Sequence, residues 1–419
     1  MPNPGKIFLG TTDICGQLSD FSKEYKLLGY KTFTYVYSDV NNYDRSYDFV
    51  LSNIYPSFLN HKQLMYFRKA YSLFIVIPVD YIMLFWAALY FDVFHFMWFK
   101  HRNLKLYLRF LRLLNKKIIV SFVGSDIRWV PLWIQELDYR GLPHAPTKTL
   151  LENNSKNSIT LNSQLRYVRV FEKYSNIIFS VPEQAQLQLK PYYNFYLPVD
   201  LKSIDFKIAS NPKLLVSIGV TEPNFKNSRI LVETISGFRK GREEIFDLVI
   251  IENRSHKEVL EILSNSDIFI YSPYVAGPGK FGMEAMAAGA LLLTGYDADW
   301  IKYPPNPPFI TTTPSNILEK LEYYLINKEE RINIVIKARA YALRYSDSKI
   351  IAENVLKNLL NPHSIPEYFP TFFREKATFD NSSDYSNAVD TCNKWTRYTS
   401  KCSWYAENVK QGTRAGLIF

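Results

Sequence analysis

The sequence predicts an α/β protein built from two consecutive doubly wound domains, each a parallel sheet with helices on both faces, followed by an appendage. Short apolar runs typical of buried strands alternate with segments of helical periodicity, and this alternation begins twice along the 419 residues. A chain of this length is also too long for a single hydrophobic core. With 47% hydrophobic and 21% charged residues, disordered and fibrous classes are excluded. Two folded domains are therefore expected.

The first domain is predicted over residues 1–198. Lys6–Gly10 is an apolar run typical of a strand, and Gly16–Leu28 then has apolar residues at helical spacing until Gly29 ends the helix. A second strand is expected at Thr32–Tyr37. Three further apolar runs are predicted as strands of the same parallel sheet: Asp92–Met97, Lys117–Phe122 and Asn176–Ser180.

The second domain is predicted over residues 199–361, after the proline-containing link Asn194–Asp200. Near-continuous apolar runs indicate strands buried on both faces, at Lys213–Ile218, Phe246–Ile251, Asp267–Tyr271 and Ala290–Thr294. Helical segments lie between them at Ser228–Arg239, His256–Ser264 and Gly282–Ala288. Ligands of such folds bind at the carboxyl ends of the strands, so we expect a site there and in the cleft between the domains. Residues 362–419, which are aromatic and rich in Asn and Ser, form the expected appendage.

The net charge of +10 belongs mostly to the N-terminal half, where residues 1–200 hold 23 Lys and Arg against 15 Asp and Glu. It is concentrated in Lys100–Lys117, which has seven basic residues and no acidic one. Five of them recur at steps of three and four and are expected on one helical face: Arg102, Lys105, Arg109, Arg112 and Lys116. Such a basic amphipathic helix is typical of a surface that binds anionic membranes, and an ordinary solvated face is the alternative. No zinc-finger spacing, RNA-binding signature or helix-turn-helix punctuation accompanies it, so nucleic acid is not an expected partner.

The nearest approach to a transmembrane segment is Leu73–Phe91. Pro78 and Asp80 interrupt it, and the remaining pieces are shorter than the roughly 20 residues that a membrane crossing needs. We therefore expect a buried or membrane-grazing helix. The start of the sequence lacks the pattern of a secretory signal, and the three cysteines have no metal-ligand spacing. The expected location is the cytoplasm, with peripheral attachment to the inner face of the membrane.

The segment most informative about chemistry is Ser272–Gly295, in which a buried strand leads into a glycine-containing loop, a helix and another strand. Gly277, Gly279 and Gly282 let the backbone approach a phosphate, and the free N–H groups at a helix start favour an anion. Glu284, in the expected first turn of that helix, is placed to accept hydrogen bonds from sugar hydroxyls. A tight turn followed by a helix with an N-terminal glutamate is the alternative interpretation.

Within this segment, GKFGMEAMAAGALLLTG resembles the nucleotide-sugar site of the retaining GT-B glycosyltransferases of the large family-4 group. Six further segments resemble motifs of that group and occur in the same order, over about residues 6–360. They are YFDVFHFMW, SFVGSDIR, LPVDLKSIDF, TEPNFKNSRILVETI, SHKEVLEILSNSD and DIFIYSP. The resemblance implies two Rossmann-like domains that face each other across a cleft. It also implies a hexosyltransferase of polysaccharide biosynthesis that moves a sugar from a nucleotide-sugar to a glycan or lipid-linked acceptor. Retention of configuration, with no metal ion and no other cofactor, is implied as well.

Carried over by motif, the resemblance implies roles for individual residues. Glu284 is expected to bind the donor ribose and Lys226 the diphosphate, which makes these two the catalytic candidates. Gly277 and Gly279 are expected in a backbone cradle, and Gly16 in the loop that faces the transferred sugar. A surface lysine in a loop is the plain alternative for Lys226.

Three residues of the first half are candidates for the acceptor side or the cleft: His95, Asp126 and Arg128. For the last two, an ordinary ion pair at a strand end is the alternative. For His95 the alternative is a histidine satisfied by hydrogen bonds at a strand end. No metal site is expected, because the six histidines are scattered along the sequence.

The chain departs from the pattern of that group at three positions. Ala276 stands where the group has the first of its two glutamates, Val123 where many members have a histidine, and Val220 where an arginine is common. A catalytically silent GT-B scaffold that binds a nucleotide or a membrane is therefore the alternative function. A dinucleotide-dependent oxidoreductase is the rival enzyme because Asp39 follows the second strand, but the first turn, GTTDICGQ, lacks G-x-G-x-x-G.

Overall fold

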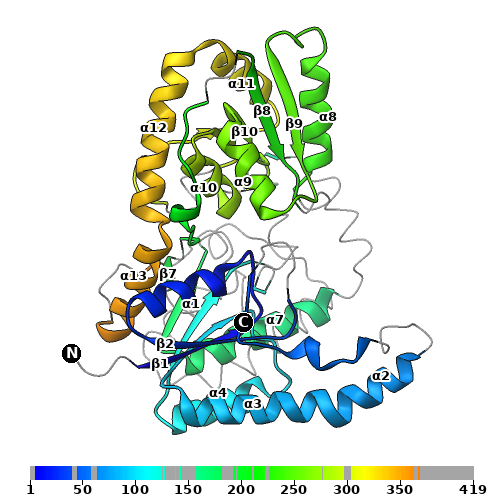
Figure 1. Ribbon diagram of the computed structural model, residues 1–419, viewed down its shortest axis with the longest axis vertical. Helices are drawn as coiled ribbons and strands as arrows, with labels where there is room; N and C mark the ends of the chain where they lie inside the picture. The colour runs from blue at the N-terminus through cyan, green and yellow to red at the C-terminus, as the bar shows by residue number, and fades with distance from the viewer. Residues whose placement is uncertain are drawn as a thin grey trace.

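The computed structural model describes residues 5–39, 45–57, 64–124, 126–127, 137, 141–142, 157–181, 192–194, 196–209, 212–221, 226–275, 277–296, 303–362 and 367–368. The strands of these residues form one eight-stranded and one five-stranded sheet, parallel except for the last strand. Figure 1 shows the second domain above the first, with helices around each sheet. The prediction of an α/β protein with two doubly wound domains is confirmed.

The first domain contains the larger sheet, in the order β13-β7-β6-β5-β4-β1-β2-β3. Its strands are β1 (Lys6–Thr11), β2 (Lys31–Val36), β3 (Phe49–Val50), β4 (Val93–Met97), β5 (Lys117–Phe122), β6 (Ile177–Ser180), β7 (Tyr192–Asn194) and β13 (Glu367–Tyr368). Its helices are α1 (Gln17–Leu27), α2 (Met65–Tyr71), α3 (Ile77–Tyr90), α4 (Leu104–Leu113) and α7 (Asn157–Tyr174), with the short turns η2 (Leu51–Ile54) and η5 (Ser72–Val76). The five strands expected from apolar runs are all present, each within a residue of its expected bounds.

The second domain contains the smaller sheet, in the order β12-β11-β10-β8-β9. Its strands are β8 (Leu214–Gly219), β9 (Phe246–Ile251), β10 (Ile268–Ile270), β11 (Leu291–Thr294) and β12 (Ile310–Thr311). Its helices are α8 (Ser228–Arg239), α9 (His256–Asn265), α10 (Gly279–Ala288), α11 (Ile317–Ile326) and α12 (Lys328–Tyr345), preceded by η7 (Leu201–Ser203). The central pair, β8 and β10, presents its carboxyl ends on the same edge because the two strands are parallel.

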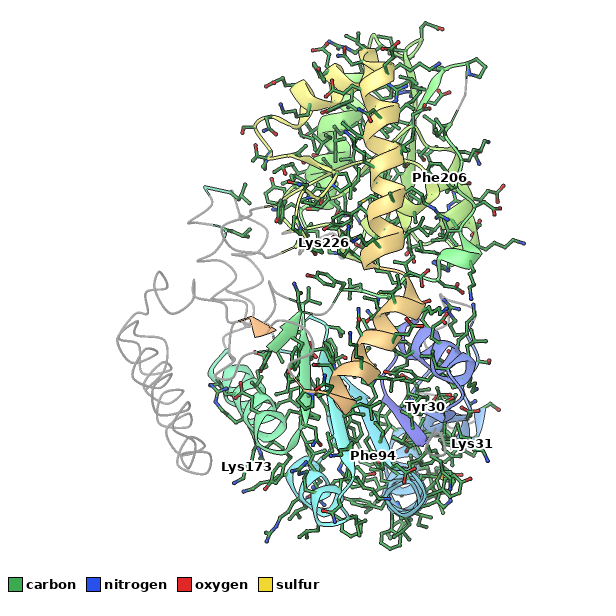
Figure 2. All side chains as sticks on the ribbon, turned by 90° about the vertical axis from the view of Figure 1, so that its left-hand side faces the viewer. Tyr30, Lys31, Phe94, Lys173, Phe206 and Lys226 are labelled. Carbon is green, nitrogen blue, oxygen red and sulfur yellow. The ribbon has the colours of Figure 1, made fainter. Side chains whose placement is uncertain are left out.

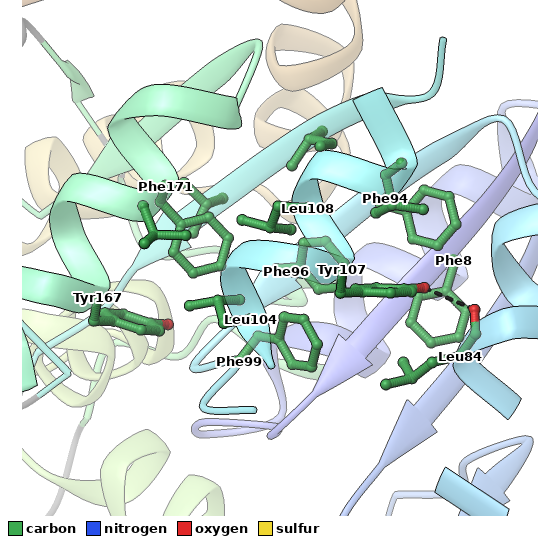
Figure 3. Packing of buried hydrophobic residues seen from close by; sticks show 14 of the residues in the cluster. Phe8, Leu84, Phe94, Phe96, Phe99, Leu104, Tyr107, Leu108, Tyr167 and Phe171 are labelled. Carbon is green, nitrogen blue, oxygen red and sulfur yellow. Dashed lines mark hydrogen bonds between the residues drawn. The ribbon is translucent and has the colours of Figure 1, made fainter. Parts of the chain in front are cut away.

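An aromatic core fixes α3 and α4 on one face of the larger sheet. The rings of Phe8 and Phe94 lie 5.4 Å apart between centroids, and those of Phe94 and Phe96 lie 5.8 Å apart. From α4, Tyr107 packs edge-on against Phe96 and donates a 2.9 Å hydrogen bond to the carbonyl oxygen of Leu84 on α3 (Figure 3). The two helices are thus held to the sheet and to each other.

The chain returns to the first domain after α12. Helix α13 (Ser348–Leu360) buries Ile351 and Val355 in the same apolar cluster as Phe21 of α1, and Figure 1 shows the two helices side by side. The sequence pattern places residues 348–360 in the second domain, whereas the structure packs them in the first because their apolar stripe completes its core. Strand β13 (Glu367–Tyr368) then pairs with β7. Apart from these two residues, the predicted appendage beyond residue 362 lies outside the described residues.

The apolar segment around Pro78 is longer as a helix than the sequence pattern indicates. Helices α2, η5 and α3 run on as one 26-residue helix, Met65–Tyr90, which is long and apolar enough by length and composition to cross a membrane. Pro78 does not break it, because the wider π-helical turn η5 comes immediately before α3 and Pro78 occupies the first turn of that helix.

Candidate functional site

Lys226 is held at the carboxyl edge of the smaller sheet. Its ammonium donates hydrogen bonds to the hydroxyl of Thr221 (2.7 Å), just beyond β8, and to that of Tyr271 (2.5 Å), just beyond β10. Ser272 fixes the backbone by donating to the carbonyl oxygen of Lys226 at 2.6 Å. Figure 2 shows Lys226 at the end of the second domain that faces the first. A positive charge is therefore fixed where doubly wound sheets bind ligands.

Three glycines around the start of α10 have a positive φ or close neighbours that disfavour a side chain. Gly277 has φ of 119°, and a Cβ there would come within 2.6 Å of the ring of Tyr303. Gly279, with φ of 56°, is the first residue of α10. A Cβ on Gly282 would lie 2.8 Å from the side chain of Pro278 and would also crowd β11. These glycines thus allow α10 to start directly at the edge of the sheet.

Glu284 lies in the second turn of α10, because the helix begins at Gly279 and not near Gly282 as the apolar pattern indicates. Its side chain is buried, and Oε1 lies 3.0 Å from Nε2 of His256, the first residue of α9. The sequence pattern does not single out His256. Its position could have indicated it, because His256 directly follows Ser255, and the capping box of Ser255 with Glu258 marks the start of α9.

Lys280 joins α10 to the first domain. Its ammonium is buried and donates to the carbonyl oxygen of Cys15 (2.6 Å) and to Oδ2 of Asp20 on α1 (2.8 Å). Burial alone would lower the pKa of this ammonium, but the carboxylates of Asp20 and Glu284 outweigh burial and raise its pKa. Sequence reasoning missed this residue, because a lysine in a glycine-rich turn gives no sign of a partner some 260 positions away.

The turn that contains Gly16 is therefore next to α10. Gly16 has φ of 73° and precedes α1, and its neighbour Cys15 accepts the hydrogen bond from Lys280. Asp13 holds the turn by accepting hydrogen bonds from the backbone N–H groups of Leu18 (3.0 Å) and Ser19. Burial raises the pKa of Asp13 in spite of these bonds. The structure thus brings the predicted turn of the first domain to the start of the predicted donor-side helix.

Another candidate of the first domain, Asp126, follows the end of β5. Asp126 is fully buried and accepts hydrogen bonds from the backbone of Gly124 (2.8 Å) and Val123 (3.3 Å). Burial outweighs these bonds and raises its pKa to about 7. Arg128 and Ala276 lie outside the described residues.

His95 is a core residue of β4. Its side chain is 0% exposed, Nδ1 lies 3.1 Å from the hydroxyl of Tyr25, and Nε2 lies 2.8 Å from the hydroxyl of Ser121. Both ring nitrogens thus have partners inside the domain. Burial lowers the pKa of His95 from its ordinary 6.5 to about 3, so the ring stays neutral at physiological pH.

We expect His95 to make the folded state less stable in mild acid. Its pKa is depressed on folding, so the unfolded chain binds more protons below pH 6.5 and the free energy of unfolding falls as the pH falls toward 3. Between pH 6.5 and about pH 5 this loss is about 2 kcal/mol. Urea unfolding of wild type and His95→Gln at both pH values should show a steeper fall for wild type. Asp126 has the opposite pH dependence, but it is present in both wild type and His95→Gln and therefore cancels in the comparison. An equal fall in the free energy of unfolding in the two proteins would contradict the prediction.

The basic residues predicted on one face belong to α4 and its flanks. Arg102, Arg109 and Arg112 are exposed, whereas Lys105 and Lys116 are half-buried. Arg112 also donates a 2.9 Å hydrogen bond to Oδ1 of Asn176. The opposite side of α4 is buried, as the pattern predicts, so the three arginines face outward.

The fold is similar to that of a solved glycosyltransferase. One match is a glycosyltransferase from Rickettsia africae, with a TM-score of 0.51 and 10% identity over 86% of this chain and 100% of that one. Another is a sucrose-phosphate synthase from Thermosynechococcus elongatus, with a TM-score of 0.49 and 10% identity over 84% of this chain and 98% of that one. No protein-family model and no curated protein matches the sequence. The chain has the GT-B fold, as the resemblance implies.

Proposed function

We propose that this chain is a glycosyltransferase that moves a sugar from a nucleotide-sugar donor to a glycan or lipid-linked acceptor. The observation that carries the proposal is the ammonium of Lys226, held between Thr221 and Tyr271 at the carboxyl edge of the smaller sheet. A fixed cation at this edge suits the diphosphate of a nucleotide-sugar. The buried carboxylate of Glu284 suits the ribose hydroxyls of the same ligand.

The proposed chemistry uses charges and dipoles that are already in place. Cleavage of the bond to the sugar leaves negative charge on the diphosphate. In this proposal, the ammonium of Lys226 and the N–H groups at the start of α10 stabilise that charge. We therefore propose a metal-independent reaction, with retention of configuration as the family resemblance implies.

The proposed acceptor side is the first domain, which contributes the turn with Gly16. The exposed cations Arg102, Arg109 and Arg112 suit an anionic surface. We propose that the enzyme works at the cytoplasmic face of a membrane as a peripheral protein.

Donor binding tests this proposal through Glu284. We expect Glu284→Ala to weaken binding of the preferred nucleotide-sugar about 10- to 100-fold, the effect of losing hydrogen bonds to a charged group. Titration calorimetry on the purified full chain is the measurement. Glu261→Ala is the matched control, since Glu261 is an exposed glutamate on neighbouring α9. Unchanged affinity in Glu284→Ala would remove this residue from the site.

A catalytically silent nucleotide-binding scaffold is the second candidate function. It is favoured by Ala276, which replaces the glutamate that the resembled group places near the transferred sugar. Tight nucleotide binding with no turnover across many donors and acceptors would support the scaffold over the enzyme.

A further inference from the structure

The helix Met65–Tyr90 exposes large apolar side chains along its outer side. Those more than half exposed are Met65, Tyr66, Phe67, Leu73, Phe74, Ile82, Phe85 and Leu89. Only 28% of the residues in its most apolar stretch are buried, whereas the core helix of a soluble domain is mostly buried. Contiguous apolar surfaces of this kind on a folded domain mark interaction sites.

The inner side of the same helix is fastened to the domain. Val76, Leu84 and Ala87 are buried in the aromatic core. Asp80 accepts a 2.6 Å hydrogen bond from the hydroxyl of Tyr35, and Leu84 accepts one from Tyr107. A helix packed on a sheet along this length cannot cross a bilayer without leaving the domain. Its exposed side can, however, enter a membrane that lies parallel to it.

Helix α4 extends this surface and adds its charge. Phe110 of α4 stacks on Phe85 of α3 at 5.9 Å, and Leu106 is 63% exposed on the outer side of α4. The exposed cations Arg102 and Arg109 accompany it. Figure 1 shows α2, α3 and α4 along the side of the first domain that faces away from the second.

The charge of this surface selects its partner. Residues 64–91 and 100–117 together contain nine Lys and Arg and one acidic residue, Asp80, which is buried. Two copies of the chain that met through this surface would bring like charges together. Trp86, Tyr81 and Tyr90 are also exposed there, and such rings favour the headgroup level of a bilayer. An anionic lipid bilayer provides acyl chains for the apolar side chains of this surface and phosphates for its cations.

We propose that the outer side of Met65–Tyr90 and of α4 forms a membrane-docking surface, in which the long helix lies in the plane of an anionic bilayer. Its apolar side chains enter the boundary between headgroups and acyl chains, and the cations of α4 contact lipid phosphates. The inference deepens the proposed function by naming the surface that brings the enzyme to a membrane. The inference rests on the proposed function only for the reason why the protein would bind a membrane.

The test is sedimentation of the full chain with phosphatidylcholine vesicles that contain or lack phosphatidylglycerol. We expect wild type to bind the anionic vesicles and Phe74→Glu/Ile82→Glu to bind them at least ~10-fold more weakly, because two exposed apolar side chains lose their burial in lipid. Arg102→Glu/Arg109→Glu should remove the preference for phosphatidylglycerol. Ile326→Glu/Ile336→Glu, which changes exposed isoleucines of the second domain, is the matched control and should bind like wild type.

Two outcomes would overturn the proposal. One is equal vesicle binding by wild type and Phe74→Glu/Ile82→Glu, with unchanged circular dichroism. The other is a stable dimer of wild type in light scattering that the same variant dissociates, which would assign the surface to a second copy of the chain. The vesicle assay contains no nucleotide-sugar, so a failure to bind vesicles would not contradict the proposed sugar transfer. Equally, a failure to bind nucleotide-sugars would not contradict the proposed membrane-docking surface.

Discussion

Replacing Lys280 with methionine is expected to lower the free energy of the first unfolding transition by about 3 kcal/mol. The ammonium lies buried between the domains, 2.8 Å from Oδ2 of Asp20 and 2.6 Å from the carbonyl oxygen of Cys15. Removing one partner of a buried pair leaves the other charge poorly compensated, which typically costs 3–5 kcal/mol. We expect the lower end, because Arg45 also lies 2.8 Å from Asp20. Chemical denaturation gives the free energy.

The matched control is Lys349→Met, which removes an exposed pair between Lys349 and Glu353 of α13. Their side chains are 56% and 46% exposed, so the loss of this pair should cost under about 1 kcal/mol. A double-mutant cycle with Asp20→Asn isolates the coupling of Lys280 to Asp20. A coupling energy near zero, or equal effects of the two lysine variants, would contradict the assignment of Lys280 as the main polar contact between α10 and α1.

Lys226→Met is expected to lower kcat for sugar transfer by about 10²–10³-fold, the usual cost of removing one preorganised group that stabilises developing negative charge. The effect should fall on kcat more than on KM, because the charge on the diphosphate grows as its bond to the sugar breaks. Methionine keeps the length of the side chain but cannot donate to Thr221 and Tyr271. Steady-state kinetics with the preferred donor is the measurement.

Lys213→Met controls for the loss of a lysine from the same domain. Lys213 precedes β8 at the end of the strand opposite Lys226, and its ammonium pairs with Asp247 at 2.7 Å. Its removal should leave kcat within a factor of about 2 of wild type, because it lies on the edge of the sheet opposite the proposed site. Equal losses in the two variants would mean that Lys226 acts through stability and not through the reaction.

Buried strands were the part of the fold most open to prediction from sequence. Lys117–Phe122 matches its predicted bounds, because a strand covered on both faces leaves an uninterrupted apolar run. Phe246–Ile251 also matches, although it is the edge strand β9 and is not buried on both faces as its apolar run indicates. Short strands such as β3 and β12 escaped prediction, since two residues give no periodicity. The core that receives α13 could not be predicted, because periodicity shows that a helix has an apolar side and not which core that side joins.

The candidate site was predictable where it depends on local sequence and not where it depends on distant contacts. Lys226 and the glycines around the start of α10 were predictable, because each lies in a segment in which a strand, a turn and a helix follow one another. The partners of Glu284 and Lys280, His256 and Asp20, come from other elements of the chain. The sequence pattern predicts that Pro78 interrupts the helix, whereas Met65–Tyr90 continues through it. A proline is tolerated there because a π-helical turn precedes it.

Nucleotide release from a panel of UDP-, GDP- and ADP-sugars tests the central claim most directly. The purified full chain is assayed with anionic vesicles that carry candidate glycan and lipid-linked acceptors, with and without a chelator. We predict that at least one donor is turned over, that the chelator leaves the rate unchanged, and that Lys226→Met loses the activity while Lys213→Met keeps it. Failure of every nucleotide and nucleotide-sugar to bind would contradict the assignment of this edge of the sheet as a donor site.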